Sequence, residues 1–230
     1  MFGNGLAGLI AGAAGVLMLV SAAMAADPAV APAAGETQAA GLGFFVHAGP
    51  AGIELDEGAK IYAGDGRVPG GTIKVKRHFT AAVEAGYFIS PNFAISFTGG
   101  YPPNVKIEAA GTMNGMGRVG ASTYGPMTVT MHYHFTGLGR LQPYIGAGPA
   151  FMYVFDQTDG LMNSLHVDNT AGFTFQAGAD YMLTDRWGVF VDVKKAILRT
   201  DVSGFLGPAP IRADLRLDPL VVHTGVTLRF

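Results

Sequence analysis

Apolar and polar residues alternate one by one along much of this sequence, and that pattern limits the possible folds more than any other feature. Successive side chains of a β-strand point to opposite faces, so alternation with a period of two predicts strands with one apolar and one polar face. The pattern recurs from Met127 to Thr136 and from Phe173 to Leu183. Near the C-terminus one face carries Leu220, Val222, Val226, Leu228 and Phe230. We therefore predict an all-β fold.

The alternating segments are about as long as a tilted strand that crosses a membrane, which takes about 9–11 residues. Short connections alternate with long ones near residues 56–75, 105–125, 156–169 and 201–216. Short turns on one side and long loops on the other are typical of bacterial outer-membrane barrels. We predict an antiparallel eight-stranded transmembrane β-barrel over residues 42–230, with short periplasmic turns and long extracellular loops. Its strands are expected near 42–55, 76–89, 92–104, 126–136, 142–155, 170–183, 187–200 and 217–230.

Composition and the N-terminal segment favour this barrel over a soluble barrel or sandwich, which would alternate in the same way. Charged residues make up 14 % of the chain, against about 25 % in a soluble domain. The apolar run from Leu6 to Val20 and the small residues Ala23 and Ala25 predict a signal peptide over residues 1–25. No Lys or Arg precedes the run, and an N-terminal membrane anchor is the alternative. Residues 26–41, rich in Ala, Pro and Gly, are predicted to form a disordered linker.

Several classes of function are disfavoured by the residues present. The formal net charge of −2 provides no basic field for nucleic acid, and the lack of cysteine removes thiolate metal sites. His132 and His134 lie on one strand face about 7 Å apart, a spacing that two metal ligands can use. No third ligand lies nearby in sequence, and no Ser lies at an offset that indicates a lipid A deacylase. We predict no enzymatic activity, no cofactor and no metal.

The inward-facing positions suggest what fills the barrel. Eight strands enclose a space that side chains nearly fill, so a wide aqueous pore is disfavoured. In the hairpin around Asp185, Lys194 is expected opposite Gln176, and Asp192 opposite Gly178. The inward charges form either an ion-pair cluster that closes the lower barrel, or a selectivity filter or proton-linked gate. The predicted lumen-lining residues are Glu84, Phe88, His132, His134, Asp180, Phe190, Asp192 and Lys194.

Four prolines suggest where the wall could open. A closed barrel has no free edge, so a proline inside a strand removes a ladder hydrogen bond that lipid cannot replace. Pro50, Pro102, Pro103 and Pro149 fall within predicted strands, in the outer half of the wall. We interpret them as candidates for a lateral opening. The alternative is that the strands end there and the prolines begin loops.

Aromatic residues near the strand ends predict the two interfacial girdles of a membrane barrel. Outer-membrane lipid and lipopolysaccharide are therefore expected partners. Phe230 faces outward by parity and is expected in the periplasmic girdle. A terminal aromatic residue on such a strand resembles the recognition signal of the outer-membrane assembly machinery. Apolar residues in the long connections predict a greasy mouth over the barrel, and they are Ile61, Tyr62, Met113, Met116, Leu161, Met162 and Phe205.

The sequence resembles the OmpW family of outer-membrane proteins, which includes the AlkL-type importers of hydrophobic substrates. The resemblance covers nearly the whole mature chain, although His47 stands where the family often has Arg and Leu220 where an aromatic residue is common. The stretches that carry it are Phe44 to Gly49, Pro126 to Phe135, Gln142 to Gly148, Gln176 to Tyr181, Leu217 to Val221, and Arg229-Phe230. It implies an eight-stranded barrel with a narrow apolar lumen, no enzymatic activity, and small hydrophobic ligands that leave sideways into the membrane.

These observations lead to one functional prediction and one alternative. We predict a monomeric barrel in the outer membrane of a Gram-negative bacterium that passively admits small hydrophobic molecules. The alternative is a barrel that conducts nothing and serves a structural role or binds partners through its loops.

Overall fold

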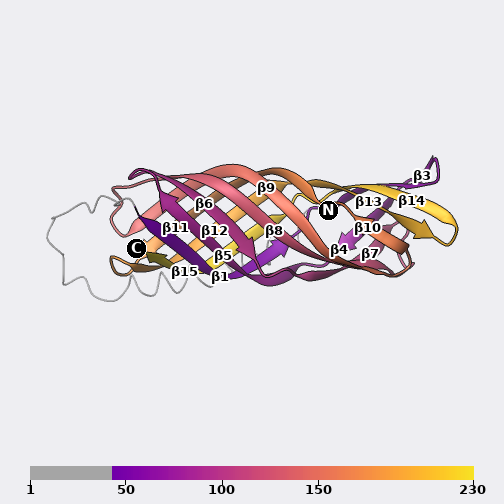
Figure 1. Cartoon of the computed structure of the whole chain (residues 1–230), viewed down its shortest axis with the longest axis horizontal. Coiled ribbons are helices and arrows are strands. Elements are labelled where there is room, and N and C mark those ends of the chain that lie inside the picture. Colours follow the sequence, from indigo (N-terminus) through magenta and orange to yellow (C-terminus); the bar gives the residue numbers. More distant parts are fainter. Residues whose placement is uncertain (1–42) are drawn as a thin grey trace.

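The computed structural model describes residues 43–230, which form a closed antiparallel barrel lengthened at one end by further strands (Figure 1). The predicted signal peptide (1–25) and linker (26–41) lie outside the described residues. Among residues 43–230, no helix is long and apolar enough to cross a membrane. The ring consists of β1 (Phe44–Glu54), β5 (His78–Phe88), β6 (Phe93–Gly100), β8 (Arg118–His134), β9 (Leu141–Asp159), β11 (Thr170–Met182), β12 (Trp187–Ile197) and β15 (Leu220–Arg229).

The ring closes through pairing of its first and last strands. β1 pairs with β15 on one side and β5 on the other, and the β8–β9 pairing completes the circle. Lys194 lies opposite Gln176, and Asp192 opposite Gly178, as the hairpin around Asp185 predicts. The eight-stranded antiparallel barrel is therefore confirmed, and each predicted strand coincides with one strand of the ring.

The long connections differ from the loops expected for them, because most of their residues form strands. These strands lengthen the barrel beyond the ring, at the end opposite the C-terminus (Figure 1). We call this part the extension. It contains β2 (Gly58–Ala63), β3 (Gly66–Arg67), β4 (Gly71–Val75), β7 (Asn104–Gly111), β10 (Asn163–Val167), β13 (Arg199–Leu206) and β14 (Ala209–Arg216), together with the upper ends of β8 and β9.

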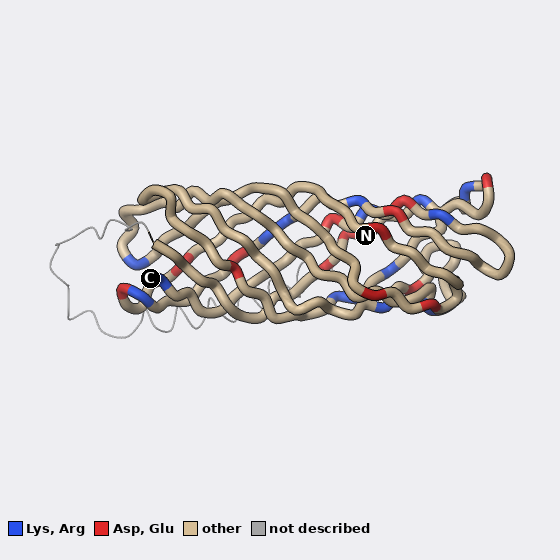
Figure 2. The backbone as a smooth tube through the Cα atoms, in the orientation of Figure 1, with Lys and Arg blue, Asp and Glu red and all other residues tan. Residues whose placement is uncertain are grey.

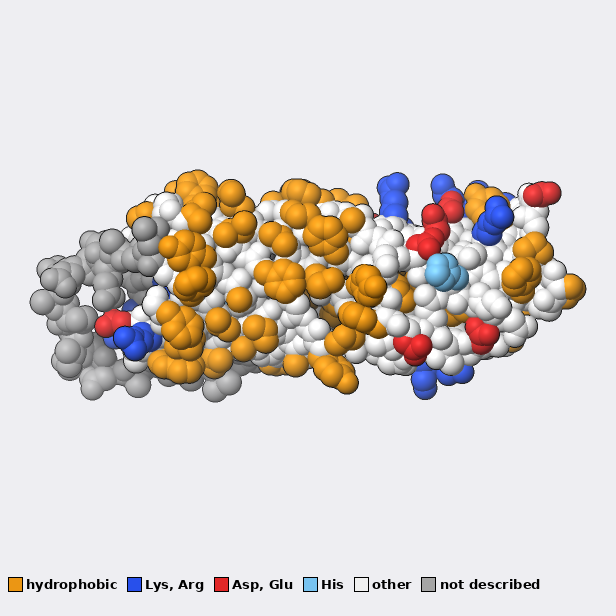
Figure 3. Space-filling model, in the orientation of Figure 1, with side chains coloured by type: hydrophobic (Ala, Val, Ile, Leu, Met, Phe, Trp, Pro, Cys, Tyr) orange, Lys and Arg blue, Asp and Glu red, His pale blue; other side chains and the backbone are white. Residues whose placement is uncertain are grey.

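The two parts of the barrel have opposite polarity. Around the ring the outward side chains are mainly apolar and form a belt, whereas charged side chains gather on the outer surface of the extension (Figure 3). Figure 2 shows that many of the Lys, Arg, Asp and Glu residues lie along the strands of the extension. In the extension Ile73, Val75 and Ile107 point inward and are buried, and their neighbours Lys74 and Lys106 are exposed. Alternation persists in both parts, but lipid surrounds the belt and water surrounds the extension, so the apolar face turns inward above the membrane.

Candidate functional site

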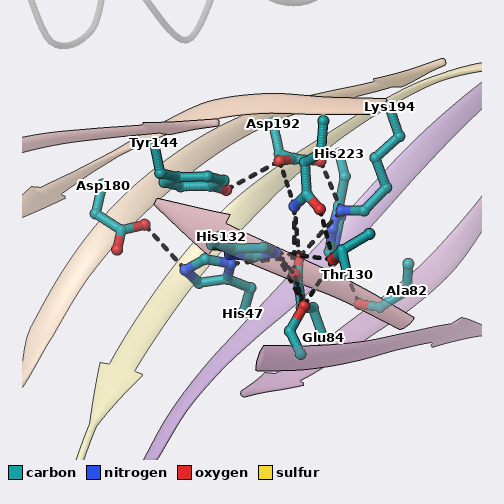
Figure 4. Close-up of polar contacts among 12 residues, drawn as sticks. His47, Ala82, Glu84, Thr130, His132, Tyr144, Asp180, Asp192, Lys194 and His223 are labelled. Carbon is teal, nitrogen blue, oxygen red and sulfur yellow. Dashed lines mark hydrogen bonds and ion pairs between the residues drawn. The ribbon is translucent and has the colours of Figure 1, made fainter. Parts of the chain in front are cut away.

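A network of buried charges fills the lower part of the ring. Lys194, on β12, donates to Glu84 Oε2 on β5 (3.0 Å) and to Asp192 Oδ1 (2.6 Å) (Figure 4). The Gln176 amide on β11 donates to Asp192 Oδ2 at 2.7 Å, and the Ser96 hydroxyl on β6 donates to Glu84 Oε1 at 2.6 Å. Four strands thus meet across the lumen through groups that are almost completely buried.

A second group of charges lies beside the first. His47, on β1, places Nε2 2.9 Å from Asp180 Oδ1 and Nδ1 3.6 Å from Glu84 Oε2. Arg229 donates to the other Asp180 oxygen at 2.7 Å. The His47 ring also stacks on Phe190, with 4.3 Å between ring centroids. We call the two groups together the charged plug, because their ion-paired and aromatic side chains fill the lower lumen.

All eight residues predicted to line the lumen lie inside the barrel. Glu84, Asp180, Asp192 and Lys194 belong to the charged plug, and Phe190 stacks within it. The other three pack against buried rings: Phe88 contacts Phe45 and His134, and His132 stacks on Tyr144. Six other residues bond or form ion pairs with the plug but were not among those predicted to line the lumen, although parity places them on inward faces. They are His47, Ser96, Thr130, Tyr144, Gln176 and Arg229.

Packing between strands places a serine beside His132. The two residues are far apart in the sequence, so their spacing does not reveal the contact. Ser96 Oγ lies 3.0 Å from His132 Nε2, and Glu84 Oε1 lies 3.2 Å from the same nitrogen. A catalytic triad needs the acid on the other ring nitrogen, where it orients the imidazole. In this cluster the serine and the acid share one nitrogen, so the relay of a triad is not formed. No group of three or more His, Cys, Asp or Glu in residues 43–230 is arranged to hold a metal ion.

Above the charged plug the lumen becomes apolar. A chamber lies there whose space, including space open to solvent, is about 700 Å³, and it is lined by residues of β1, β4, β7, β8, β9, β10, β13, β14 and β15. The polar residues in its lining are Ser122, Tyr124 and Thr200. The narrow apolar lumen implied by the family resemblance is thus confined to this upper level. Aliphatic side chains dominate the lining, among them Ile53, Leu55, Ile73, Val75, Val105, Ile107, Met152, Val167, Leu198, Leu215 and Leu217.

The greasy mouth expected from the long connections is only partly present. Ile61 and Met162 are buried and pack in the apolar core of the extension, which the chamber adjoins. Met116, Leu161 and Phe205 are exposed. The apolar residues of the connections are therefore divided between the interior of the extension and its outer surface.

The wall between β6 and β8 is interrupted beside the chamber. β6 pairs with β8 only as far as Gly99, opposite Met127, and β7 begins to pair with β8 at Asn104. Between these points lie Pro102, Pro103 and Pro126, none of which can donate a backbone hydrogen bond. The Tyr124 N–H donates to Pro103 O at 3.3 Å. We call this interval, residues 100–103 and 124–126, the β6–β8 break.

A groove on the outer surface lies over the β6–β8 break. Its empty space is about 1040 Å³, which includes space open to the surroundings. Pro126 lines both this groove and the inner chamber, so one residue separates the two spaces. The other lining side chains are mainly apolar and include Val83, Phe97, Tyr101, Pro102, Met127 and Phe155.

The other two prolines interrupt the ladder on one side of their strands. The β1–β15 pairing is broken between Ala48 and Ala51, around Pro50, and the β8–β9 pairing is broken around Pro149. Each proline remains paired on its other side, with Ala81 and Phe173 respectively. Pro50 and Pro149 therefore differ from Pro102 and Pro103, which lie between β6 and β7 in no strand.

These features define the class of protein first. A closed ring with an apolar outer belt, a polar interior and aromatic residues near both ends of its strands is an outer-membrane β-barrel. The chain belongs to the OmpW family, whose model matches residues 40–230. The protein is located in the outer membrane of a Gram-negative bacterium.

Similar proteins agree with this assignment. The chain is 32 % identical to the dibenzothiophene metabolism operon protein PahQ of Pseudomonas aeruginosa over 79 % of this chain and 86 % of that protein. It is 31 % identical to the outer membrane protein AlkL of Ectopseudomonas oleovorans over 76 % of both chains. Among solved structures, OprG of Pseudomonas aeruginosa superposes with a TM-score of 0.77, at 20 % identity and covering 82 % of this chain and 96 % of OprG, which supports the fold alone.

Proposed function

We propose that the protein takes small hydrophobic molecules into its apolar chamber from the cell exterior and releases them sideways into the membrane at the β6–β8 break. The observation that carries this proposal is the position of Pro126, which lines both the chamber and the outer groove. The charged plug supports a sideways exit, because an apolar molecule that continued downward would have to separate paired buried charges. The relative PahQ is named for a dibenzothiophene operon, which is consistent with an aromatic hydrophobic cargo.

We further propose that the chain acts without catalysis and as a monomer. The geometry around His132 supports the first point, because the serine and the acid meet the same ring nitrogen. The competing function is a barrel that conducts nothing and either has a structural role or binds partners through its long connections, which form the extension. Uptake of a labelled alkane or monoterpene by cells with and without the protein separates the two. Faster uptake with the protein supports transport, and equal uptake rejects it.

A reversible cross-link tests the exit route. The chain has no native cysteine, so Tyr101→Cys combined with Gly125→Cys introduces one thiol pair across the β6–β8 break. Oxidation should slow uptake, and a reductant should restore it. The matched control is Phe97→Cys with Val129→Cys, two residues that lie opposite each other in the intact part of the β6–β8 ladder. Uptake that continues unchanged through an oxidised Tyr101–Gly125 bridge rejects lateral release while leaving uptake itself intact.

A further inference from the structure

One polar group in the chamber has no partner. The Ser122 side chain is 4 % exposed, lines the apolar chamber, and its hydroxyl forms no hydrogen bond. The other two hydroxyls of the lining are already engaged: Tyr124 with His78 Nε2 at 2.9 Å, and Thr200 as donor to Asp168 O at 2.6 Å. A buried hydroxyl without a partner is costly, and native structures generally satisfy such groups. Ser122 therefore has hydrogen-bonding capacity that points into the chamber.

We infer that Ser122 is a specificity-determining residue, and that the chamber prefers hydrophobic molecules with a single hydroxyl or carbonyl oxygen over pure hydrocarbons. The inference rests on the proposed function and specifies its substrate class. A serine hydroxyl both donates and accepts, so it suits an alcohol, a phenol, an aldehyde or a ketone. No Lys or Arg lines the chamber, so a carboxylate would be buried without a counter-charge. Ionised fatty acids are therefore excluded from the class.

The position of Ser122 also sets the orientation of the bound molecule. Ser122 and Pro126 lie on the same inward face of β8, four residues apart, with Pro126 nearer the membrane. At strand rise this separation is about 13 Å along the wall. A molecule held at Ser122 by its oxygen directs its apolar tail toward the β6–β8 break. It would enter the outer leaflet tail first with its polar end outward, the orientation that amphiphiles adopt there.

The experiment compares octane, 1-octanol and ionised octanoate on the whole protein in lipid nanodiscs. Backbone amide shifts of the chamber wall are followed by NMR during titration, at one lipid concentration so that partition into lipid is the same for every variant. Loss of one hydrogen bond of ordinary strength changes affinity about fivefold. We expect Ser122→Ala to weaken 1-octanol binding about fivefold and to leave octane binding within twofold. Octanoate should not bind either protein.

Two further variants keep the test specific. Ser122→Thr retains the hydroxyl and should preserve the preference for 1-octanol. Thr200→Val removes a chamber hydroxyl that is already bonded to Asp168, so it should leave the ratio of 1-octanol to octane affinity unchanged. Equal loss of both ligands in Ser122→Ala, or no loss of either, overturns the role of Ser122 while chamber binding stands. If neither ligand shifts the chamber amides of the native protein, the proposed function fails together with this inference.

Discussion

The lower lumen and the chamber are consecutive levels of one barrel, yet their interiors are built in opposite ways. The lower lumen holds Glu84, Asp180, Asp192 and Lys194 behind an apolar outer wall. The chamber holds aliphatic side chains behind an outer wall that carries lysines and acids. One strand shows the change: the inward positions Asp192 and Lys194 on β12 are followed by Ala196 and then, just after the strand ends, by Leu198, and both are apolar.

The comparison teaches that each level of the interior is complementary to the surroundings outside it. In lipid, the ring needs few apolar contacts inside, because its outer side chains already lie in an apolar medium. Paired charges can then fill the lumen. In water, the extension must gain its stability from an apolar interior, as a soluble protein does. An apolar cavity beside the membrane follows from that requirement.

The largest expected effect is in the charged plug. Lys194→Met leaves the Glu84 and Asp192 carboxylates without their shared cation, and removal of one partner of a buried ion pair costs about 3–5 kcal/mol. The free energy of unfolding can be measured in urea by the fluorescence of Trp187, which is the single tryptophan of the chain. Lys106→Met, on the exposed face of the extension, is the control and should change little. If Lys194→Met is as stable as the native protein, the lower lumen does not depend on its buried ion pairs and the contrast with the chamber is wrong.

A smaller effect is expected in the chamber wall. Ile107→Ala removes part of the buried apolar interior of the extension, and substitutions of this kind cost about 2 kcal/mol or more. Its neighbour Glu108 faces outward and pairs with Lys76 at 3.2 Å, so Glu108→Ala should cost less than about 1 kcal/mol. The two variants are compared by the same urea unfolding. If Glu108→Ala is the more damaging, the inverted polarity of the extension is wrong.

The smallest effect concerns Glu57, in the extension. Its Oε1 accepts a hydrogen bond from the Val75 N–H at 2.6 Å, and burial raises the pKa of its carboxyl from 4.5 to about 7. Between these pH values the folded protein binds more protons than the unfolded chain, so this group lowers stability as pH rises through the window. Glu57→Gln should be about 1 kcal/mol more stable than the native protein above pH 7, after allowance for solvent screening.

Unfolding midpoints measured across the window from pH 4.5 to 7 test this prediction. The control is Glu54→Gln, because the Glu54 carboxylate pairs with Arg77 at 3.1 Å and lies at the same level of the barrel. An unchanged pH dependence in Glu57→Gln would show that Glu57 is not the group responsible. The measurement compares two kinds of buried carboxyl group: Glu57 accepts a hydrogen bond from a neutral N–H, whereas the plug carboxylates pair with cations.

Alternation in the sequence was enough to predict the ring, because lipid outside and polar groups inside impose the same pattern on every strand. It was less useful in the extension, where Ile73, Lys74 and Val75 alternate equally well but lie in a segment that its length predicts to be a long loop. Their apolar face turns inward, and short strands between glycine turns resemble loops in composition. The alternation was present, but these segments are shorter than a membrane-spanning strand and their apolar face points inward instead of toward lipid.

The sequence predicted which residues of the candidate site face inward, but it did not predict which of them contact each other. Parity placed Glu84 and Lys194 inside, and hairpin register placed Gln176 opposite Lys194. The contact between Gln176 and Glu84 joins residues 92 positions apart across the lumen, and no local pattern specifies it. The contact between Ser96 and His132 likewise joins different strands, so no local pattern specifies it. Pro126 begins a predicted strand, but its place in the β6–β8 break depends on where β6 ends and β7 begins.

The closing pair of strands has a consequence for how the chain tolerates change. At Gly49 a Cβ atom would lie 2.0 Å from Thr224 O, and at Gly225 one would lie 2.1 Å from Ala48 O. Any side chain at either position forces β1 and β15 apart where Pro50 already interrupts the ladder. A mutational scan would therefore find both of these glycines intolerant of substitution, although neither lines the chamber. Their intolerance would reflect the fit of two backbones rather than any contact with cargo.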